Sequence, residues 1–524
     1  MWKDQIDKLL ETRAQHAMGG GEKRIARQHE SGRLTAKERI DLLLDPDSFT
    51  EIDSCMSAQP GASVGGASRS VPGDGVLTGF GLIEGRRVCV AAEDFTVVGG
   101  TLGAAHAAKI ARLQDLALKM KVPVIFLNDS GGARIEEGIH ALSGYGEIFQ
   151  RHVQASGIIP QICAILGPCS GGACYSPALC DFTFVVKGIS KMFITGPAVV
   201  ESVLGRRPTF EELGGAEMHS SVSGCAHAMF EDEKTCLLGI RTLLSYLPSN
   251  CSELPPLAVE DHPIKRRLGA PVSLEEIVPD DARKPYDMNQ VIRELMDVGE
   301  PVYEILKHFA PNVITGFSRL DGRVIGVVAN QPTAFGGVLD CDASDKMARF
   351  IRFCDCFGIP LLTLVDVPAF LPGTDQERKG IIRHGAKVLY AYSQAVVPKI
   401  TVIVRKAFGG AYIAMNSRSL GADLVYAWPI AQIAVMGAEG AVQILYGREI
   451  KNAEDPAAML AEKQAEYERD FLNPTIAMER GYVDEVILPS ETRECLIRSF
   501  GFLCESQTTP AQDGQLRRHG NIPL

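Results

Sequence analysis

The chain has 524 residues, too many for one ordinary hydrophobic core, so we expect two domains. A composition of 46% hydrophobic and 22% charged residues is typical of a soluble α/β protein. The net charge of −11 and the lack of basic tracts argue against a nucleic-acid partner. No apolar run reaches the ~20 residues that span a bilayer, so we expect no direct membrane insertion.

No apolar signal segment opens the sequence, and its 14 cysteines are scattered without the spacing of a zinc site. Reduced thiols in the cytoplasm are the simplest interpretation of such cysteines. We therefore expect a cytoplasmic protein that holds no metal.

The first half of the sequence begins with helices and then forms a β-hairpin. An amphipathic helix is expected over residues 5–15, and Thr35 caps the start of another helix. A loop is expected over residues 61–75. Residues 75–94 follow as a hairpin that turns at "EGR".

Alternating helices and strands come after the hairpin. A helix is expected at about residues 106–119, and the apolar runs 123–129 and 161–166 are short buried strands. This alternation predicts right-handed βα crossovers and a mainly parallel sheet. A polar, proline-rich stretch at 247–281 is the best linker candidate, and a second hairpin pattern follows it at 318–332.

An internal repeat relates the two halves of the chain. The segment "ARLQDLALKMKVPVIFLND" starts at Ala111 and "ARFIRFCDCFGIPLLTLVD" starts at Ala348, an offset of 237 (348 − 111). Further along, "GPCSGGACY" aligns with "RKAFGGAY", with Gly171 matching Gly409 at an offset of 238 (409 − 171). We conclude that the halves are copies of one domain, divided as residues 1–260 and 261–524.

Each copy carries a Gly-Gly-Ala segment directly after an apolar strand. A strand that ends in two glycines and leads into a helix presents free backbone N–H groups at a positive helix end. Such donors can hold an oxyanion, an enolate or a phosphate. The alternative is that the glycines only permit close packing, and the duplication leaves both interpretations open.

A second matched position supports the first interpretation. Gly132 lies three residues after Asp129, and Ala369 lies three residues after Asp366, again at strand ends. Each half is therefore expected to offer one N–H donor from each of two turns. The sequence contains no G-x-S-x-G elbow, H-E-x-x-H pair or Walker A motif that would indicate other chemistry.

At these residues the sequence resembles the carboxyltransferase subunit of biotin-dependent acyl-CoA carboxylases. The resemblance covers nearly the whole chain and includes "EDFTVVGGT", "NDSGGARIEEG", "GPCSGGACYSPAL", "IIRHGAKVLYAY", "RKAFGGAY" and the tail "RRHGNIPL". It is similar to the propionyl-CoA carboxylase β chain, methylmalonyl-CoA carboxyltransferase and the α chain of sodium-pumping methylmalonyl-CoA decarboxylase.

The resemblance implies an α/β fold of two tandem crotonase-like (ββα-spiral) domains. It implies a homohexamer, a trimer of dimers, with each active site between the N-terminal domain of one chain and the C-terminal domain of another. Acyl-CoA is expected on domain 1–260 and biotin on domain 261–524. The reaction would move a carboxyl group between carboxybiotin and the α-carbon of a coenzyme A thioester, such as propionyl-CoA or acetyl-CoA. The biotin ureido nitrogen would take the α-proton, so the protein supplies position and backbone dipoles.

The resemblance also implies site residues and partners. The family's two oxyanion pairs fall on Gly171-Gly172 and Gly410-Ala411, and the substrate-binding candidates are Gly132, Ala133, Tyr145, Ile413 and Ala369. The sequence has no ATP-grasp signature and no biotinyl-lysine motif. We therefore expect a separate biotin carboxyl carrier protein, with a biotin carboxylase subunit or a membrane decarboxylase subunit.

Three positions depart from the common family pattern. Ala369 stands where many relatives have glycine, and Arg378 and Lys379 stand where relatives often have Tyr-Gly. Ile413 occupies a position where many propionyl-CoA carboxylases have aspartate and that is tied to acyl-chain choice. This favours the carboxyltransferase and decarboxylase relatives, or an acyl preference other than propionyl.

Two other hypotheses remain at this point. A biotin-free crotonase-like hydratase or isomerase would need paired acids over a CoA pocket, and Glu136 with Glu137 is the nearby candidate. A non-catalytic scaffold within a carboxylase complex would be indicated by degraded glycines, which this sequence does not show.

Overall fold

The computed structural model describes residues 2–57, 71–258, 273–297, 299 and 302–523. Two compact units make up the chain: unit 1 is Met1–Glu253 with Pro510–Pro523, and unit 2 is Leu254–Thr509. The expected division at residues 260 and 261 falls outside the described residues, as do residues 61–70 of the expected loop.

Unit 1 is built on one mixed sheet in which a parallel part follows an antiparallel edge. The strand order is β1-β2-β3-β4-β5-β6-β8, and β7 pairs with β5. The first three strands pair antiparallel, and all pairs from β3 onward are parallel. The strands are β1 Thr50–Ile52, β2 Val76–Ile83, β3 Arg86–Glu93, β4 Val124–Ser130, β5 Gln161–Ser170, β6 Phe182–Val186, β7 Lys191–Phe193 and β8 Ala228–Phe230.

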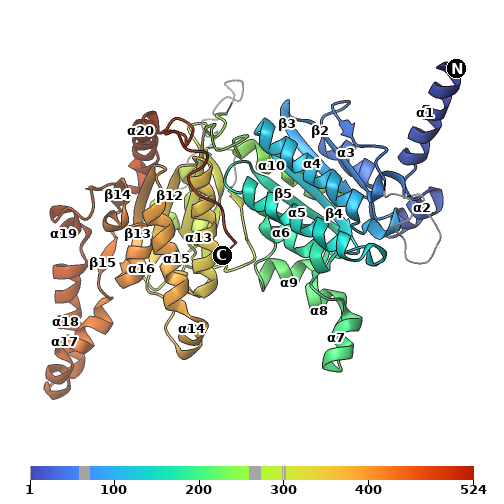
Figure 1. Cartoon of the computed structure of the whole chain (residues 1–524). Coiled ribbons are helices and arrows are strands. Elements are labelled where there is room, and N and C mark those ends of the chain that lie inside the picture. Colours follow the sequence, from blue (N-terminus) through green and yellow to red (C-terminus); the bar gives the residue numbers. More distant parts are fainter. Residues whose placement is uncertain (1, 58–70, 259–272, 298, 300–301, 524) are drawn as a thin grey trace. The chain divides into compact units, whose positions relative to one another are not determined.

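Helices cover this sheet, and α4 and α5 lie side by side over it (Figure 1). Thr35 caps α3 through a capping box with Glu38, as the sequence predicts. The helices of unit 1 are α1 Trp2–Ala17, α2 Glu22–Glu30, α3 Ala36–Leu43, α4 Ala104–Met120, α5 Ile139–Ala155, α6 Tyr175–Leu179, α7 Pro197–Leu204, α8 Phe210–Gly214, α9 Ala216–Ser221 and α10 Glu233–Tyr246.

Unit 2 has a sheet of the same design. Its order is β9-β10-β11-β12-β13-β14-β16, with β15 paired to β13, and the pairs from β11 onward are parallel. The strands are β9 Tyr303–Glu304, β10 Val313–Leu320, β11 Arg323–Asn330, β12 Leu361–Val367, β13 Lys399–Phe408, β14 Leu424–Ala427, β15 Gln432–Ala434 and β16 Glu485–Val486.

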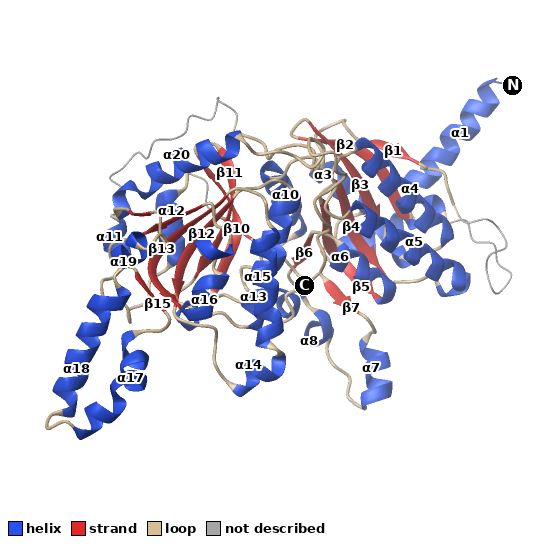
Figure 2. Ribbon diagram, turned by 60° about the vertical axis from the view of Figure 1, so that its left-hand side comes forward, coloured by secondary structure: helices blue, strands red, loops and turns tan. Residues whose placement is uncertain are grey.

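Helices flank the strands of this second sheet as well (Figure 2). They are α11 Leu274–Ile277, α12 Met288–Leu295, α13 Cys341–Cys356, α14 Thr374–Lys379, α15 Ile381–Gln394, α16 Gly409–Ala414, α17 Ala438–Asn452, α18 Pro456–Tyr467, α19 Pro474–Glu479 and α20 Thr492–Glu505. The prediction of an α/β chain with mainly parallel sheets is therefore confirmed.

The strand boundaries follow the repeat that was counted in the sequence. Strand β10 starts 237 residues after β2 (313 − 76), and β13 starts 238 residues after β5 (399 − 161). In both units the two central parallel strands are buried along almost their whole length, as continuous apolar runs in a covered sheet should be. The repeated sequence thus specifies a repeated strand order.

The C-terminal tail belongs to unit 1, whereas the sequence placed it in the second domain. Arg517 donates to the carbonyl oxygens of Val153 and Ser156 at the end of α5, where a cation opposes the negative end of the helix. The Asn521 side chain donates to Asp181 at 2.8 Å. These bonds to unit 1 account for the difference.

Candidate active site

Two turns of unit 1 meet at the carboxyl ends of neighbouring strands. Strand β4 leads into Gly131-Gly132, and β5 leads into a short 3₁₀ helix over Gly171–Cys174. Ser170 donates its hydroxyl to the Gly131 carbonyl at 2.9 Å, which ties one turn to the other. A Cβ on Gly132 would lie 2.8 Å from the Ser170 carbonyl oxygen, so only glycine fits at that contact. Four of the predicted positions, Gly132, Ala133, Gly171 and Gly172, are therefore neighbours.

The backbone N–H of Gly132 is already engaged. It donates to the Ser130 hydroxyl at 3.2 Å, so it differs from the free donor that the sequence suggested. The next residue, Ala133, forms an isolated bridge with Leu102. In this bridge the Leu102 N–H donates to the Gly132 carbonyl and the Arg134 N–H donates to the Leu102 carbonyl, so the Ala133 N–H is not used. The donors that this region can offer a ligand are therefore the Ala133 N–H and those of the Gly171–Cys174 turn, where a helix start leaves N–H groups without intrahelical partners.

Tyr145 forms the wall beside Gly172. A Cβ on Gly172 would lie 2.8 to 3.1 Å from three carbon atoms of the Tyr145 ring. The tyrosine projects from α5, is 4% exposed, and burial raises the pKa of its hydroxyl well above the usual range. The predicted residue Tyr145 is thus placed against the predicted oxyanion residue.

Unit 2 repeats the glycine turn in a more open form. Gly409 has φ +60°, matching +63° at Gly171, so the two turns share a left-handed first residue. Gly410 is exposed, and a Cβ added to it would meet no atom within 4 Å. Ala411 is 1% exposed, so its methyl group is buried. In the repeat, Gly410 corresponds to Gly172, and Ala411 corresponds to Ala173.

The other predicted residues of unit 2 lie near this turn or at the surface. Ile413 is one helical turn beyond Gly410 and is 45% exposed. Ala369 accepts a hydrogen bond from Leu339 through its carbonyl oxygen after β12, which is the strand paired with β13. Arg378 and Lys379 are exposed in the last turn of α14.

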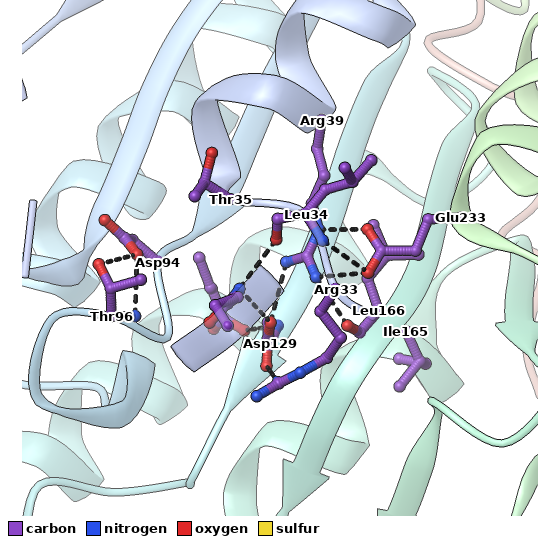
Figure 3. A network of polar contacts seen from close by, with 12 residues as sticks. Arg33, Leu34, Thr35, Arg39, Asp94, Thr96, Asp129, Ile165, Leu166 and Glu233 are labelled. Atoms are coloured by element: carbon purple, nitrogen blue, oxygen red, sulfur yellow. Dashed lines mark hydrogen bonds and ion pairs between the residues drawn. The ribbon is translucent and has the colours of Figure 1, made fainter. Parts of the chain in front are cut away.

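A buried ion network supports the turn of unit 1 (Figure 3). Asp129, the penultimate residue of β4, accepts hydrogen bonds from Arg33 at 2.8 Å and Arg39 at 3.0 Å. Arg39 also pairs with Glu233 at 2.7 Å and donates to the Leu166 carbonyl at 2.8 Å. Burial raises the pKa of Asp129 to about 6, and the two arginines keep it below neutrality, so the carboxylate is charged at pH 7.

Unit 2 anchors the matching aspartate with a different arginine. Asp366 pairs with Arg405 at 3.1 Å, and Arg405 donates to three backbone carbonyls in residues 279–284. The sequence repeat aligned Asp129 with Asp366, but their three arginine partners, Arg33, Arg39 and Arg405, were not predicted. The available signal was a repeated aspartate at the end of a buried strand, because a buried carboxylate requires a partner.

The acidic pair considered for a hydratase is not available for catalysis. Glu137 is buried, accepts from Arg134 at 2.6 Å and accepts from the Ala104 N–H at 2.7 Å, which caps α4. Glu136 is exposed. One carboxylate is therefore a buried structural cap, whereas the other is exposed at the surface.

No group of three or more metal-ligating side chains is found within the described ranges. Over the same part of the chain, every helix is too short or too polar to cross a membrane.

Comparison with known proteins identifies the family. Residues 27–517 match the carboxyl transferase domain family. The carboxyltransferase subunit of propionyl-CoA carboxylase from Haloferax mediterranei is 53% identical over 522 residues, covering 100% of this chain and 99% of that protein. The α subunit of methylmalonyl-CoA decarboxylase from Veillonella parvula is 51% identical over 523 residues, covering 100% of this chain and 99% of that protein.

A solved structure agrees with these relatives. The transcarboxylase 12S structure, described as a hexamer with methylmalonyl-CoA bound, matches with a TM-score of 0.92 and 48% identity. The match covers 100% of this chain and 99% of that one. The chain therefore belongs to the carboxyl transferase family.

Proposed function

We propose that this chain is the carboxyltransferase subunit of a biotin-dependent enzyme. It moves a carboxyl group between carboxybiotin on a separate carrier protein and the α-carbon of a short-chain acyl-CoA. The observation that carries this proposal is the pair of matched turns at residues 171–173 and 409–411, each at the end of a central parallel strand. They contain the proposed donor pairs Gly171-Gly172 and Gly410-Ala411. Backbone donors at such turns suit oxygen atoms that gain negative charge during the reaction.

The two turns differ in the space that they offer, which supports a division of labour. The Tyr145 ring closes the space beside Gly172, so this turn suits a small acyl thioester. The space beside Gly410 is open, so this turn suits the larger bicyclic ring of biotin. Carboxybiotin, when bound, supplies the carboxyl group and a ureido nitrogen that accepts the α-proton. The residues of this chain position the two substrates and stabilise their oxygen atoms.

Two competing functions have less support. The hydratase hypothesis needs free paired acids, and Glu137 is already bonded to Arg134 and to the start of α4. The scaffold hypothesis needs a damaged turn, and both turns retain their glycines and matching left-handed first residues. Transfer in the opposite direction, as in a transcarboxylase or a methylmalonyl-CoA decarboxylase, uses the same geometry and is part of the proposal.

We further propose that the two units are crotonase-like copies and that the protein is a cytoplasmic homohexamer. The repeated strand order supports duplication. Helices α7 and α17, which follow β7 and β15, carry large exposed apolar side chains that suit contacts between copies. Examples are Val199, Val203, Leu204, Ile444 and Leu445. A biotin carrier protein and either a biotin carboxylase or a membrane decarboxylase subunit complete the proposed system.

The proposal is tested with purified protein and no other subunit. Carboxyl-labelled free carboxybiotin is supplied with acetyl-, propionyl- or butyryl-CoA, and labelled malonyl-type products are measured. We expect transfer to at least one acyl-CoA, no ATP hydrolysis and no avidin signal from the protein. Absence of biotin-dependent transfer to any of them, together with hydration of an enoyl-CoA, would overturn the assignment.

A further inference from the structure

Three aromatic side chains form a continuous row beside Gly172. Tyr145 and Phe149 project from α5 with ring centroids 5.8 Å apart, in a stacked arrangement. Phe149 meets Tyr175, at the start of α6, edge to face at 6.0 Å. Tyr145 is buried against the glycine, whereas Tyr175 is 47% exposed. The row of Tyr145, Phe149 and Tyr175 therefore runs from the glycine turn out to the surface.

Unit 2 lacks this row although it has the same helices. The buried positions of α5 match those of α15 at an offset of 240: Ala141, Tyr145, Ile148 and His152 correspond to Ile381, Gly385, Val388 and Tyr392. The same offset places Leu389 at the position of Phe149. The glycine-turn alignment places Ile413 at the position of Tyr175.

Unit 2 shows which of these side chains the fold can form without. Unit 2 builds the same sheet and the same pair of covering helices with Gly385, Leu389 and Ile413 at these three positions. The fold therefore does not require rings at these three positions, although in unit 2 the Phe370 ring lies against Gly385, 3.2 Å from where a Cβ would stand. The consequence of the rings in unit 1 is local, because the space beside Gly172 is closed while the space beside Gly410 is open to beyond 4 Å.

We infer that the row of Tyr145, Phe149 and Tyr175 is the wall that sets the length of the acyl group in unit 1. The inference rests on the proposed function and extends it to named specificity residues. An apolar, half-exposed wall beside backbone donors fits a thioester whose oxygen faces the turn and whose aliphatic chain lies along the rings. Rigid rings limit chain length better than flexible side chains, because close-packed rings leave no room for an added methylene.

The test replaces two of the three rings, Phe149 and Tyr175, with the residues that unit 2 carries at the same positions. Phe149→Leu and Tyr175→Ile are expected to fold, because Leu389 and Ile413 occupy the equivalent sites. Each should raise the ratio of kcat/KM for butyryl-CoA to that for propionyl-CoA about ten-fold or more, the usual discrimination for one methylene. Tyr175→Trp should shift the ratio the other way, towards acetyl-CoA.

A control variant and the KM for free carboxybiotin distinguish the possible outcomes. Phe80→Leu removes an aromatic ring elsewhere in unit 1 whose exposure, 43%, is similar to that of Tyr175. It should leave the ratio of kcat/KM for butyryl-CoA to that for propionyl-CoA unchanged. The KM for free carboxybiotin should stay constant in all of the variants. Unchanged acyl-CoA ratios in active variants would overturn the inference, and so would a change confined to the KM for carboxybiotin. Failure of the unaltered protein to transfer carboxyl groups would instead overturn the proposed function.

Discussion

Replacing Gly410 with valine separates a role in catalysis from a role in packing. Gly410 is the second residue of α16, it is exposed, and a Cβ added there would meet no atom within 4 Å. Gly409 beside it has φ +60°, a conformation that disfavours other residues, so Gly410 is the position of choice. We expect Gly410→Val to change the free energy of unfolding by less than about 1 kcal/mol.

The effect on turnover should be far larger. If the donors of this turn hold a biotin oxygen, a branched side chain beside them pushes the ligand away. Loss of one such donor costs about 3–4 kcal/mol of transition-state stabilisation, which corresponds to about 10²–10³ in rate. The assay is the transfer of label from free carboxybiotin to propionyl-CoA, with the unfolding midpoint in urea measured on the same samples.

The control for Gly410→Val is Gly501→Val. Gly501 lies within helix α20 of the same unit, and a Cβ added there would meet no atom within 4 Å. This variant should keep full transfer activity. If Gly410→Val were as active as Gly501→Val, the turn would not contact a substrate, and the proposed mechanism would be wrong.

Three further predictions concern Gly172, Ile413 and the stability of unit 1. Gly172→Val should abolish transfer to acyl-CoA yet retain more decarboxylation of free carboxybiotin than Gly410→Val does. If Gly410→Val retained more of this decarboxylation, the two substrates would be exchanged between the turns. Ile413→Asp should change the ranking of acetyl-, propionyl- and butyryl-CoA by about ten-fold; an unchanged ranking of their kcat/KM values would remove Ile413 from the acyl site. Burial lowers the pKa of His152 to about 4, so the unfolded chain binds a proton near pH 6.5 and the folded chain does not. The free energy of unfolding in urea should therefore fall by up to about 3 kcal/mol between pH 6.5 and pH 4. His152→Phe should reduce this fall, whereas Tyr392→Phe at the matching position of unit 2 should not.

Local features of the fold could be predicted because they depend on neighbouring residues. The capping box at Thr35 and Glu38, the turn of the first hairpin and the glycine turns after β5 and β13 all have short sequence signals. The repeat added long-range information, because two similar segments at a constant offset must form the same strands. Matching positions such as Gly171 and Gly409 are therefore expected to share a backbone conformation, and both have a positive φ.

Contacts between distant residues could not be predicted in the same way. The pairing of Arg39 with Glu233 joins residues 194 positions apart, and the chain contains 53 lysine and arginine residues that compete as partners. The N–H of Gly132 is occupied by Ser130, a side chain two residues away, and no pattern distinguishes such a serine from an exposed one. The tail after residue 509 has no repeat partner in unit 1, so its place there had no signal in the sequence.

Asp129 and Asp366 occupy matching positions in the two copies. The way in which each is anchored explains how the copies could diverge while keeping the same turn. A buried carboxylate is costly unless it is paired, so Asp129 and Asp366 each require a cation. In unit 2 the cation is Arg405, which lies on β13 at the position that corresponds to Gly167 on β5.

In unit 1 a cation from another part of the chain occupies that position. A Cβ on Gly167 would lie 2.0 Å from Asp129 and 2.8 Å from Arg33, so the glycine provides the space that Arg33 fills. Both copies place a positive charge beside the aspartate, but the arginines that carry it come from different positions in the sequence. Arg33 reaches Asp129 from the loop after α2, and Arg39 reaches it from α3, so this pairing also fixes the N-terminal helices to the end of β4. The same requirement for charge thus holds a different neighbouring segment in each copy: residues 33–39 in unit 1 and residues 279–284 in unit 2.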